Sequence, residues 1–206
     1  MPTSDNVFWP KWNTPFIHKF DFFTKSWQTQ TNIPAYSQLF LFFSSIVHLP
    51  KGLGMFIMGG SDQADNFSRR VTFFSKYQKL IEKPLMMMKR AFFASIFCIS
   101  DSCLYVFGGN DGDTDLSHCE RFSIQENVWR PIKPMTMQRN GASVVSFDRV
   151  IFVFGGNNSI SGSLDTIERY AVEFDKWSIP RIRLKEPLHD SIAFSVGGAR
   201  VLILGG

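Results

Sequence analysis

The chain has 206 residues, of which 44% are hydrophobic and 19% charged, a composition that provides a folded core and excludes a disordered segment. The formal net charge is +4, but lysine and arginine occur singly or in pairs, so we expect no nucleic-acid partner. Three cysteines without metal-type spacing, no signal-peptide pattern and no apolar stretch long enough to cross a bilayer predict a cytoplasmic protein without a membrane partner.

Residues 1–15 are polar and are expected to form a lead segment ahead of the fold. From residue 16 onward, short runs of β-branched and aromatic residues alternate with turn residues, as in Ile151–Phe154 followed by Gly155-Gly156. Such runs indicate strands. No stretch carries a sustained apolar period of 3.6 residues, so we expect little helix.

Four of the predicted strands end in a double glycine, and the first glycines lie at positions 59, 108, 155 and 205, which gives intervals of 49, 47 and 50 residues. The four pairs are Gly59-Gly60, Gly108-Gly109, Gly155-Gly156 and Gly205-Gly206. A fixed period of this length indicates a repeat architecture in which each repeat forms one structural unit.

A tryptophan follows the double glycines at a nearly constant distance. Trp129 and Trp177 stand 20 residues after Gly109 and 21 after Gly156, and each has an aromatic residue seven positions before it. Trp27 has the same spacing from Phe20. In the second unit we assign the tryptophan position to Tyr77. We interpret these glycines and rings as residues that define the fold.

The combined pattern is an apolar strand ending in Gly-Gly, followed by an aromatic residue and then by a Trp. This pattern resembles that of kelch-repeat proteins. The resemblance covers about residues 16–206 and implies an all-β fold, a kelch-type β-propeller of four-stranded antiparallel blades. The expected units are roughly 16–33, 34–89, 90–138, 139–188 and 189–206, which make three full blades and two half-blades. Two alternatives stay open: the half-blades close a four-blade ring, or the chain is a fragment of a larger propeller, which we favour.

The resemblance implies a protein–protein interaction module, such as a scaffold or a substrate-recruiting adaptor, that binds another protein through loops on one face. Arg90 and Arg139 stand just before the first strand of their units, where the resemblance implies contact with acidic peptides at the mouth of the channel. Alternatively, they brace their blades. His189 is assigned to the corresponding place in the last unit, where it breaks the arginine pattern.

Asp111 and Asp113 complete the candidate partner-binding residues. They lie in an acidic loop that lacks the glycine and the glutamate of a calcium loop, because Leu116 and Phe122 occupy those positions. We therefore expect no metal, no cofactor and no small-molecule substrate.

The alternative function is a kelch-fold enzyme acting on sugars, either an oxidase or an isomerase. The four histidines fall at different phases of the repeat, at positions 18, 48, 118 and 189, and no nucleophile motif is present. We therefore expect a chain that is not an enzyme.

Overall fold

The structure is a computed structural model that describes residues 17–21, 24–30, 42–62, 65–77 and 79–206. The chain divides into two units, Met1–Phe40 and Leu41–Gly206. In the first unit, strands β1 (Ile17–Asp21) and β2 (Ser26–Gln30) form an antiparallel hairpin whose register pairs Phe20 with Trp27. The predicted lead segment, residues 1–15, lies outside the described residues.

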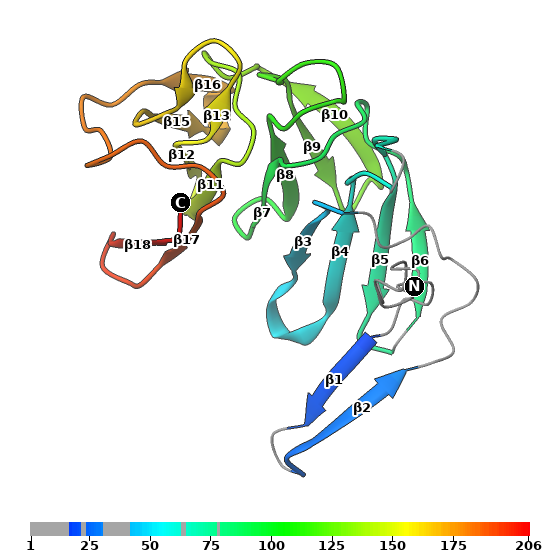
Figure 1. The fold of residues 1–206 in the computed structure, drawn as a ribbon. Coiled ribbons are helices and arrows are strands. Elements are labelled where there is room, and N and C mark those ends of the chain that lie inside the picture. The colour runs from blue at the N-terminus through cyan, green and yellow to red at the C-terminus, as the bar shows by residue number, and fades with distance from the viewer. Residues whose placement is uncertain (1–16, 22–23, 31–41, 63–64, 78) are drawn as a thin grey trace, which may run out of the picture. The chain divides into compact units, whose positions relative to one another are not determined.

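The second unit consists of three four-stranded antiparallel sheets, which we call blades 1 to 3, and a C-terminal hairpin (Figure 1). Blade 1 contains β3 (Ser45–His48), β4 (Gly54–Met58), β5 (Val71–Ser75) and β6 (Leu80–Lys83). Blade 2 contains β7 (Ala94–Cys98), β8 (Cys103–Phe107), β9 (Cys119–Ser123) and β10 (Val128–Ile132). Blade 3 contains β11 (Ser143–Phe147), β12 (Val150–Phe154), β15 (Ile167–Ala171) and β16 (Lys176–Ser178). The hairpin contains β17 (Ile192–Ser195) and β18 (Val201–Leu204).

Short elements complete the described residues: the 3-10 turns η1 (Pro50–Gly52) and η2 (Val172–Phe174) and the two-residue strands β13 (Asn157–Asn158) and β14 (Gly162–Ser163). Within the part of the chain that the structure describes, no helix is long and apolar enough to cross a membrane. The predicted all-β fold, with three complete four-stranded blades and a hairpin on either side of them in the sequence, is confirmed.

Apolar side chains fill the space between successive sheets, because each sheet is apolar on both faces. All five residues of β8 are buried, as expected of a continuous apolar run between turns. Three clusters lie between blades 1 and 2, between blades 2 and 3, and between blade 3 and the hairpin; their centres include Phe56 and Phe122, Tyr105 and Tyr170, and Val145 and Phe154, respectively. Each blade is therefore stabilised mainly by its neighbours.

The double glycines lie where the backbones of two blades meet. Gly108 and Gly109 have φ values of +61° and +94°, which side chains rarely tolerate. A Cβ on Gly108 would collide with the carbonyl oxygen of Arg139. The Gly109 amide donates a hydrogen bond of 2.8 Å to the same oxygen, and two equivalent 2.8 Å bonds join Gly60 to Arg90 and Gly156 to Leu188. The repeated glycines thus permit a close backbone contact between blades.

The tryptophans also join successive blades. Trp129 lies opposite Phe122 in blade 2, and its indole N–H donates to the carbonyl oxygen of Pro84, at the end of blade 1, at 2.9 Å. Trp177 repeats this arrangement one blade later, with an indole bond of 2.8 Å to the carbonyl oxygen of Lys133. The indole suits this position because it combines a large apolar surface with one donor.

The assignment of Tyr77 to the tryptophan position of blade 1 is corrected by the structure. Tyr77 lies in the turn between β5 and β6 and is 73% exposed. Leu80 instead holds this position. It stands opposite Phe74, which pairs with Met55 four residues before Gly59. In blade 2, Trp129 likewise stands opposite Phe122, whose partner Leu104 lies four residues before Gly108. The turn in blade 1 is one residue shorter than its counterparts, since six residues rather than seven separate Phe74 from Leu80. Because Leu80 is not aromatic, the sequence pattern leads to the nearby Tyr77 instead.

Replacing the buried ring tests this account. We expect Trp129→Ala to lower the free energy of unfolding by about 3–5 kcal/mol, because it removes a ring that is 7% exposed from the core between two blades. Tyr77→Ala is the matched control and should change the free energy by less than about 0.5 kcal/mol. Urea denaturation followed by circular dichroism measures both. Similar losses for the two variants would contradict the assignment.

Candidate functional site

The two arginines predicted at the mouth of the channel are buried inside their own blades, and each is 0% exposed. Arg90 donates to the carbonyl oxygens of Gly108 at 2.7 Å and His118 at 3.1 Å, and to the Glu120 carboxylate at 2.8 Å. Arg139 donates to the equivalent carbonyls of Gly155 and Thr166 and to the Glu168 carboxylate at 3.1 Å. These contacts match the bracing role that the sequence left open and leave no guanidinium surface for a partner.

Each glutamate also holds the loop that enters its blade. The Glu120 carboxylate accepts hydrogen bonds from the amides of Met87 at 2.7 Å and Met88 at 3.4 Å. Glu168 accepts bonds from the amides of Thr136 at 2.7 Å and Met137 at 3.2 Å. Burial lowers the pKa of Arg90 and Arg139, but the facing carboxylates oppose this shift and favour the charged guanidinium. The Arg–Glu pair fixes the base of the loop.

Sequence reasoning missed Glu120 and Glu168, although a signal was present. They stand 48 residues apart, and each is followed by Arg and then by the aromatic residue that faces the tryptophan. The periodicity that identified the glycines therefore extends to the acids. Their role was not visible because the sequence does not show that Arg90 and Arg139 face them inside the blades.

The structure also corrects the position of His189. Leu188, not His189, offers the carbonyl that accepts the amide of Gly156, so Leu188 is the counterpart of Arg90 and Arg139. His189 is instead half-buried beside two polar groups. Its Nδ1 shares a hydrogen bond of 2.9 Å with the Ser163 hydroxyl, and its Nε2 lies 3.9 Å from the Asp190 carboxylate.

Asp111 and Asp113 form the expected turn in the loop after the second double glycine. The Asp111 carboxylate accepts bonds from the amides of Asp113 at 3.0 Å and Thr114 at 2.8 Å. Burial raises the pKa of Asp111, but these amide bonds outweigh it and lower the pKa overall. The Asp113 side chain is 81% exposed and lies 3.6 Å from the Lys89 ammonium, which leaves it accessible to a partner.

Asp115, which sequence reasoning did not single out, ties this loop to blade 3. Its side chain is buried and accepts bonds from the Asn110 amide group at 3.0 Å, the Asn140 amide group at 2.6 Å and the Ser159 backbone amide at 2.9 Å. Burial disfavours its charge, but the three hydrogen bonds outweigh burial and lower the pKa of Asp115. The acid therefore sets the position of one loop relative to the next.

The connections that leave a blade and those that follow a double glycine are hydrogen-bonded to each other. The connections leaving a blade lie against those that follow its double glycine, through amide bonds from Met86 to Arg69, from Met135 to Ser117 and from Leu184 to Asp165. We call these six connections the loop face; their described residues are 61–62, 65–70, 84–89, 110–118, 133–138, 157–165 and 180–189. Exposed apolar side chains on it include Met87 at 49%, Ile160 at 84% and Ile182 at 73%.

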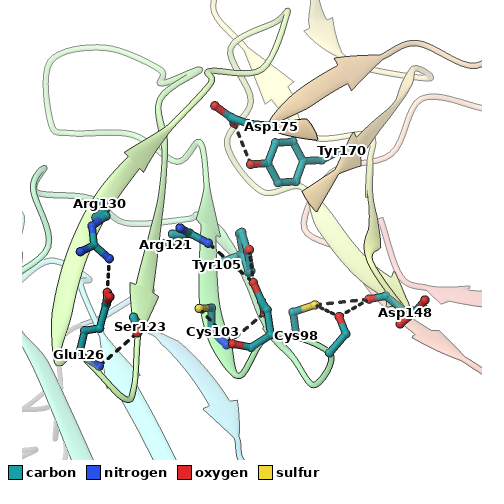
Figure 2. A network of polar contacts seen from close by, with 12 residues as sticks. Cys98, Cys103, Tyr105, Arg121, Ser123, Glu126, Arg130, Asp148, Tyr170 and Asp175 are labelled. Atoms are coloured by element: carbon teal, nitrogen blue, oxygen red, sulfur yellow. Dashed lines mark hydrogen bonds and ion pairs between the residues drawn. The ribbon is translucent and has the colours of Figure 1, made fainter. Parts of the chain in front are cut away.

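At the ends of blades 2 and 3 that lie away from the loop face, a tyrosine–aspartate pair closes a turn in each blade (Figure 2). The Tyr105 hydroxyl donates to Asp101 at 2.6 Å, and the Tyr170 hydroxyl donates to Asp175 at 2.8 Å. Burial, followed by the neighbouring aspartate, raises the pKa of each tyrosine. The Cys98 thiol lies 3.4 Å from the carbonyl oxygen of Asp148 in the next blade. This network is a structural link between the two blades.

The three cysteines are free and buried. Burial raises the pKa of Cys98, that of Cys103 to about 11 and that of Cys119 to about 12. Since the thiolate is the nucleophile and the metal ligand, these thiols are poorly suited to either role. Among the described residues, no group of three or more His, Cys, Asp or Glu side chains is arranged to hold a metal ion.

Comparison with known proteins identifies the repeat. The family model of the kelch motif matches residues 97–136 and 138–180, which contain most of blades 2 and 3. The chain carries kelch repeats. The kelch repeats of this chain thus coincide with sheets in which a double glycine ends the second strand and a tryptophan lies on the fourth.

Several known proteins are similar in sequence to parts of this chain. The chain is 28% identical over 61% of its length to a RING finger domain and kelch repeat-containing protein of Dictyostelium discoideum, and 24% identical over 75% to Kelch-like protein 25 of Xenopus tropicalis. It is 30% identical over 46% of its length to Alpha-scruin of Limulus polyphemus. These matches cover 13%, 27% and 12% of the relatives, so the chain spans a small part of each.

Separating the partners of a buried pair tests the bracing role. Arg139→Leu leaves the Glu168 carboxylate buried without its counter-charge, and we expect a loss of about 3–5 kcal/mol in unfolding free energy. Adding Glu168→Gln removes that charge while keeping an acceptor for the Thr136 amide, so the double variant should recover about 1–2 kcal/mol. Urea denaturation of wild type, both single variants and the double variant measures the coupling. A double variant less stable than Arg139→Leu alone would count against the pair.

The lowered pKa of Asp115 predicts a pH dependence. A carboxyl whose pKa is lower in the folded than in the unfolded state stabilises the fold above the ordinary value of about 3.9, and this contribution disappears as the pH falls through the folded value. Asp115→Asn should therefore be less stable than wild type at pH 6, with the difference shrinking as the pH falls below the ordinary carboxyl value of about 3.9. Unfolding free energies measured across this range provide the check, with Asp113→Asn as the exposed control. A difference independent of pH would refute the assignment.

Proposed function

We propose that this chain is a protein-interaction module that binds a partner protein through its loop face. The supporting observation is the combination of fixed loop bases and exposed apolar tips. Buried Arg–Glu pairs hold the bases, while Met87, Ile160 and Ile182 extend from the loops with about half or more of their surface exposed. Binding residues concentrate on loops that a rigid scaffold positions.

The polar groups of the loop face suit the polar edge of such an interface. Asp113 and His189, both among the sequence-predicted binding residues, are partly or largely exposed around the apolar tips, and Asp111 orders the loop that carries Asp113. Protein interfaces typically combine an apolar centre with a polar, accessible rim. We assign Asp113 and His189 to the polar edge of this interface. We also assign one pair of loops to each of the proposed units 34–89, 90–138 and 139–188.

We extend the proposal to an adaptor role for the protein that contains this chain. One relative, by its name, combines kelch repeats with a RING finger domain, and others are named Kelch-like proteins. A loop face that captures one protein and a second domain that provides another function make an adaptor. Because the three buried cysteines are free thiols, we also propose a reducing compartment such as the cytoplasm.

The alternative of a sugar-converting enzyme gains no supporting observation among the described residues. His48, His118 and His189 lie at different places in their repeats. The three thiols are buried, and the raised pKa values of Cys103 and Cys119 do not suit catalysis. We therefore retain the interaction module as the proposal.

Placing a charge at the apolar tips tests the loop face. We expect Ile160→Asp with Ile182→Asp to abolish capture of the proteins that the immobilised wild-type chain retains from a cell extract, because a carboxylate in an apolar interface core is costly to desolvate. Quantitative mass spectrometry compares the captured proteins. The matched control is Ile99→Asp, since Ile99 is 72% exposed in the β7–β8 turn at the other end of blade 2.

All variants should unfold at the temperature of wild type, because the substituted side chains are exposed. Equal loss of the same proteins in Ile99→Asp and in the loop variant would argue against the loop face. Retention of every captured protein by the loop variant would do so as well.

A further inference from the structure

Four residues form a hydrogen-bonded row, which we call the rim. Each lies two positions before the first strand of a blade or of the C-terminal hairpin, that is, before β3, β7, β11 or β17. Phe43, Phe92, Gly141 and Asp190 have φ values of +58°, +55°, +60° and +52°. The Phe92 amide donates to the carbonyl oxygen of Phe43 at 3.3 Å, the Gly141 amide to that of Phe92 at 2.7 Å, and the Asp190 amide to that of Gly141 at 2.8 Å. The connections of the loop face lead directly into the rim.

The two phenylalanines occupy a backbone conformation that disfavours them. A left-handed φ is a genuine outlier for a bulky residue, and such strain tends to persist where the side chain has a function. Gly141 occupies the same place without strain, so the fold itself does not require a phenylalanine there. What Phe43 and Phe92 contribute therefore lies in their rings.

These rings form an exposed aromatic platform. Phe43 and Phe92 are stacked with centroids 4.0 Å apart and an interplanar angle of 26°, and Phe43 is 57% exposed. All four rim residues line one hollow of about 430 Å³, together with the serines that follow them, Ser44, Ser45 and Ser191. This volume lies within the range of about 300–1,000 Å³ that is typical of ligand sites.

A carboxylate faces the hollow from the other side. A Cβ on Gly141 would lie 2.5 Å from Oδ1 of Asp190, so the glycine leaves the space that this carboxylate occupies. The Asp190 side chain is 64% exposed, and its recorded ion-pair neighbour is His189 at 3.9 Å. Across the described residues, no lysine or arginine lies within ion-pair distance of Asp190, so its charge is available to a partner.

We propose that the rim binds an arginine side chain of a partner protein. Its planar guanidinium stacks on the face of the phenylalanine platform and donates two hydrogen bonds to the Asp190 carboxylate. Arginine fits better than lysine, because it combines stacking on aromatic rings with bidentate carboxylate recognition. This charge preference is the reverse of that expected from arginines at the mouth of the channel, since Arg90 and Arg139 are buried. The proposal rests on the proposed function and names the partner chemistry at its centre.

Peptide-coated biosensor surfaces test the proposal with the full 206-residue chain. Four peptides share a Gly-Ser background and differ at one central residue: arginine, citrulline, lysine or glutamate. Citrulline keeps the planar shape of arginine and removes its charge. We expect capture on the arginine surface to exceed that on the citrulline surface at least tenfold. Equal capture on the two, or preferred capture on the glutamate surface, would overturn the proposal.

Two rim variants and one control locate the binding. Asp190→Asn, which tolerates the left-handed backbone, should lower arginine-peptide affinity at least tenfold. Phe43→Gly should weaken binding several-fold without lowering the melting temperature, because glycine relieves the backbone strain. Glu173→Gln, which neutralises an exposed carboxylate in the turn between β15 and β16, should bind as wild type does. Unchanged binding by Asp190→Asn would refute the site even if the arginine surface captures the protein.

The outcome is separable from that of the proposed function. Loss of captured proteins in the Ile160→Asp, Ile182→Asp variant, together with no arginine preference, would support the loop face and reject the arginine site. Arginine capture that depends on Asp190, without any effect of the loop variant, would support the arginine site and reject the wider loop face.

Discussion

One backbone hydrogen bond is repeated wherever a double glycine meets the next blade, and the packing between blades depends on the close approach that it marks. The second glycine of each of the first three pairs donates to a carbonyl at the entrance of the following blade or hairpin, at 2.8 Å in all three cases. The bond needs a positive φ to aim the amide and a residue without Cβ to let the carbonyl approach, as at Gly108-Gly109. With the backbones held this closely, the indoles of Trp129 and Trp177 reach the preceding blade and the apolar clusters close.

The buried arginines continue this contact through the blade. The carbonyl oxygen of Arg139 accepts a hydrogen bond from the Gly109 amide, and its guanidinium donates one to the carbonyl oxygen of Gly155. The next residue, Gly156, donates to the carbonyl oxygen of Leu188. One residue thus connects the contact on one side of its blade with the contact on the other. Burying a charged pair contributes little net stability compared with apolar packing, but it makes the geometry specific. Leu188 has no guanidinium, so this chain of contacts ends at the hairpin β17–β18.

The features predictable from sequence are those that recur with a constant period, because their spacing reflects a repeated backbone contact. The double glycines, Trp129 and Trp177 belong to this class. Prediction failed where the repeat departs from its pattern. In blade 1 the turn is one residue shorter and Leu80 takes the tryptophan position, so Tyr77 was assigned to it; a one-residue offset placed His189 where Leu188 lies. It also failed for burial, since the pattern that located Arg90 could not distinguish a surface residue from one paired with Glu120. The rim escaped notice because its four positions hold three different residue types.

That difference in the rim explains how a regular scaffold can carry an irregular surface. The backbone at Phe43, Phe92, Gly141 and Asp190 is nearly identical, with φ between +52° and +58° for the three side-chain-bearing residues and +60° for the glycine, and hydrogen bonds between blades hold it. Side chains can therefore vary there without moving the blades. Because the positive charges of Arg90 and Arg139 are confined to the interior, they do not reach this surface, and the charge of the rim comes from Asp190 with His189 beside it. An aromatic side and an acidic side then face each other across Gly141, and this asymmetry can orient a single cationic side chain.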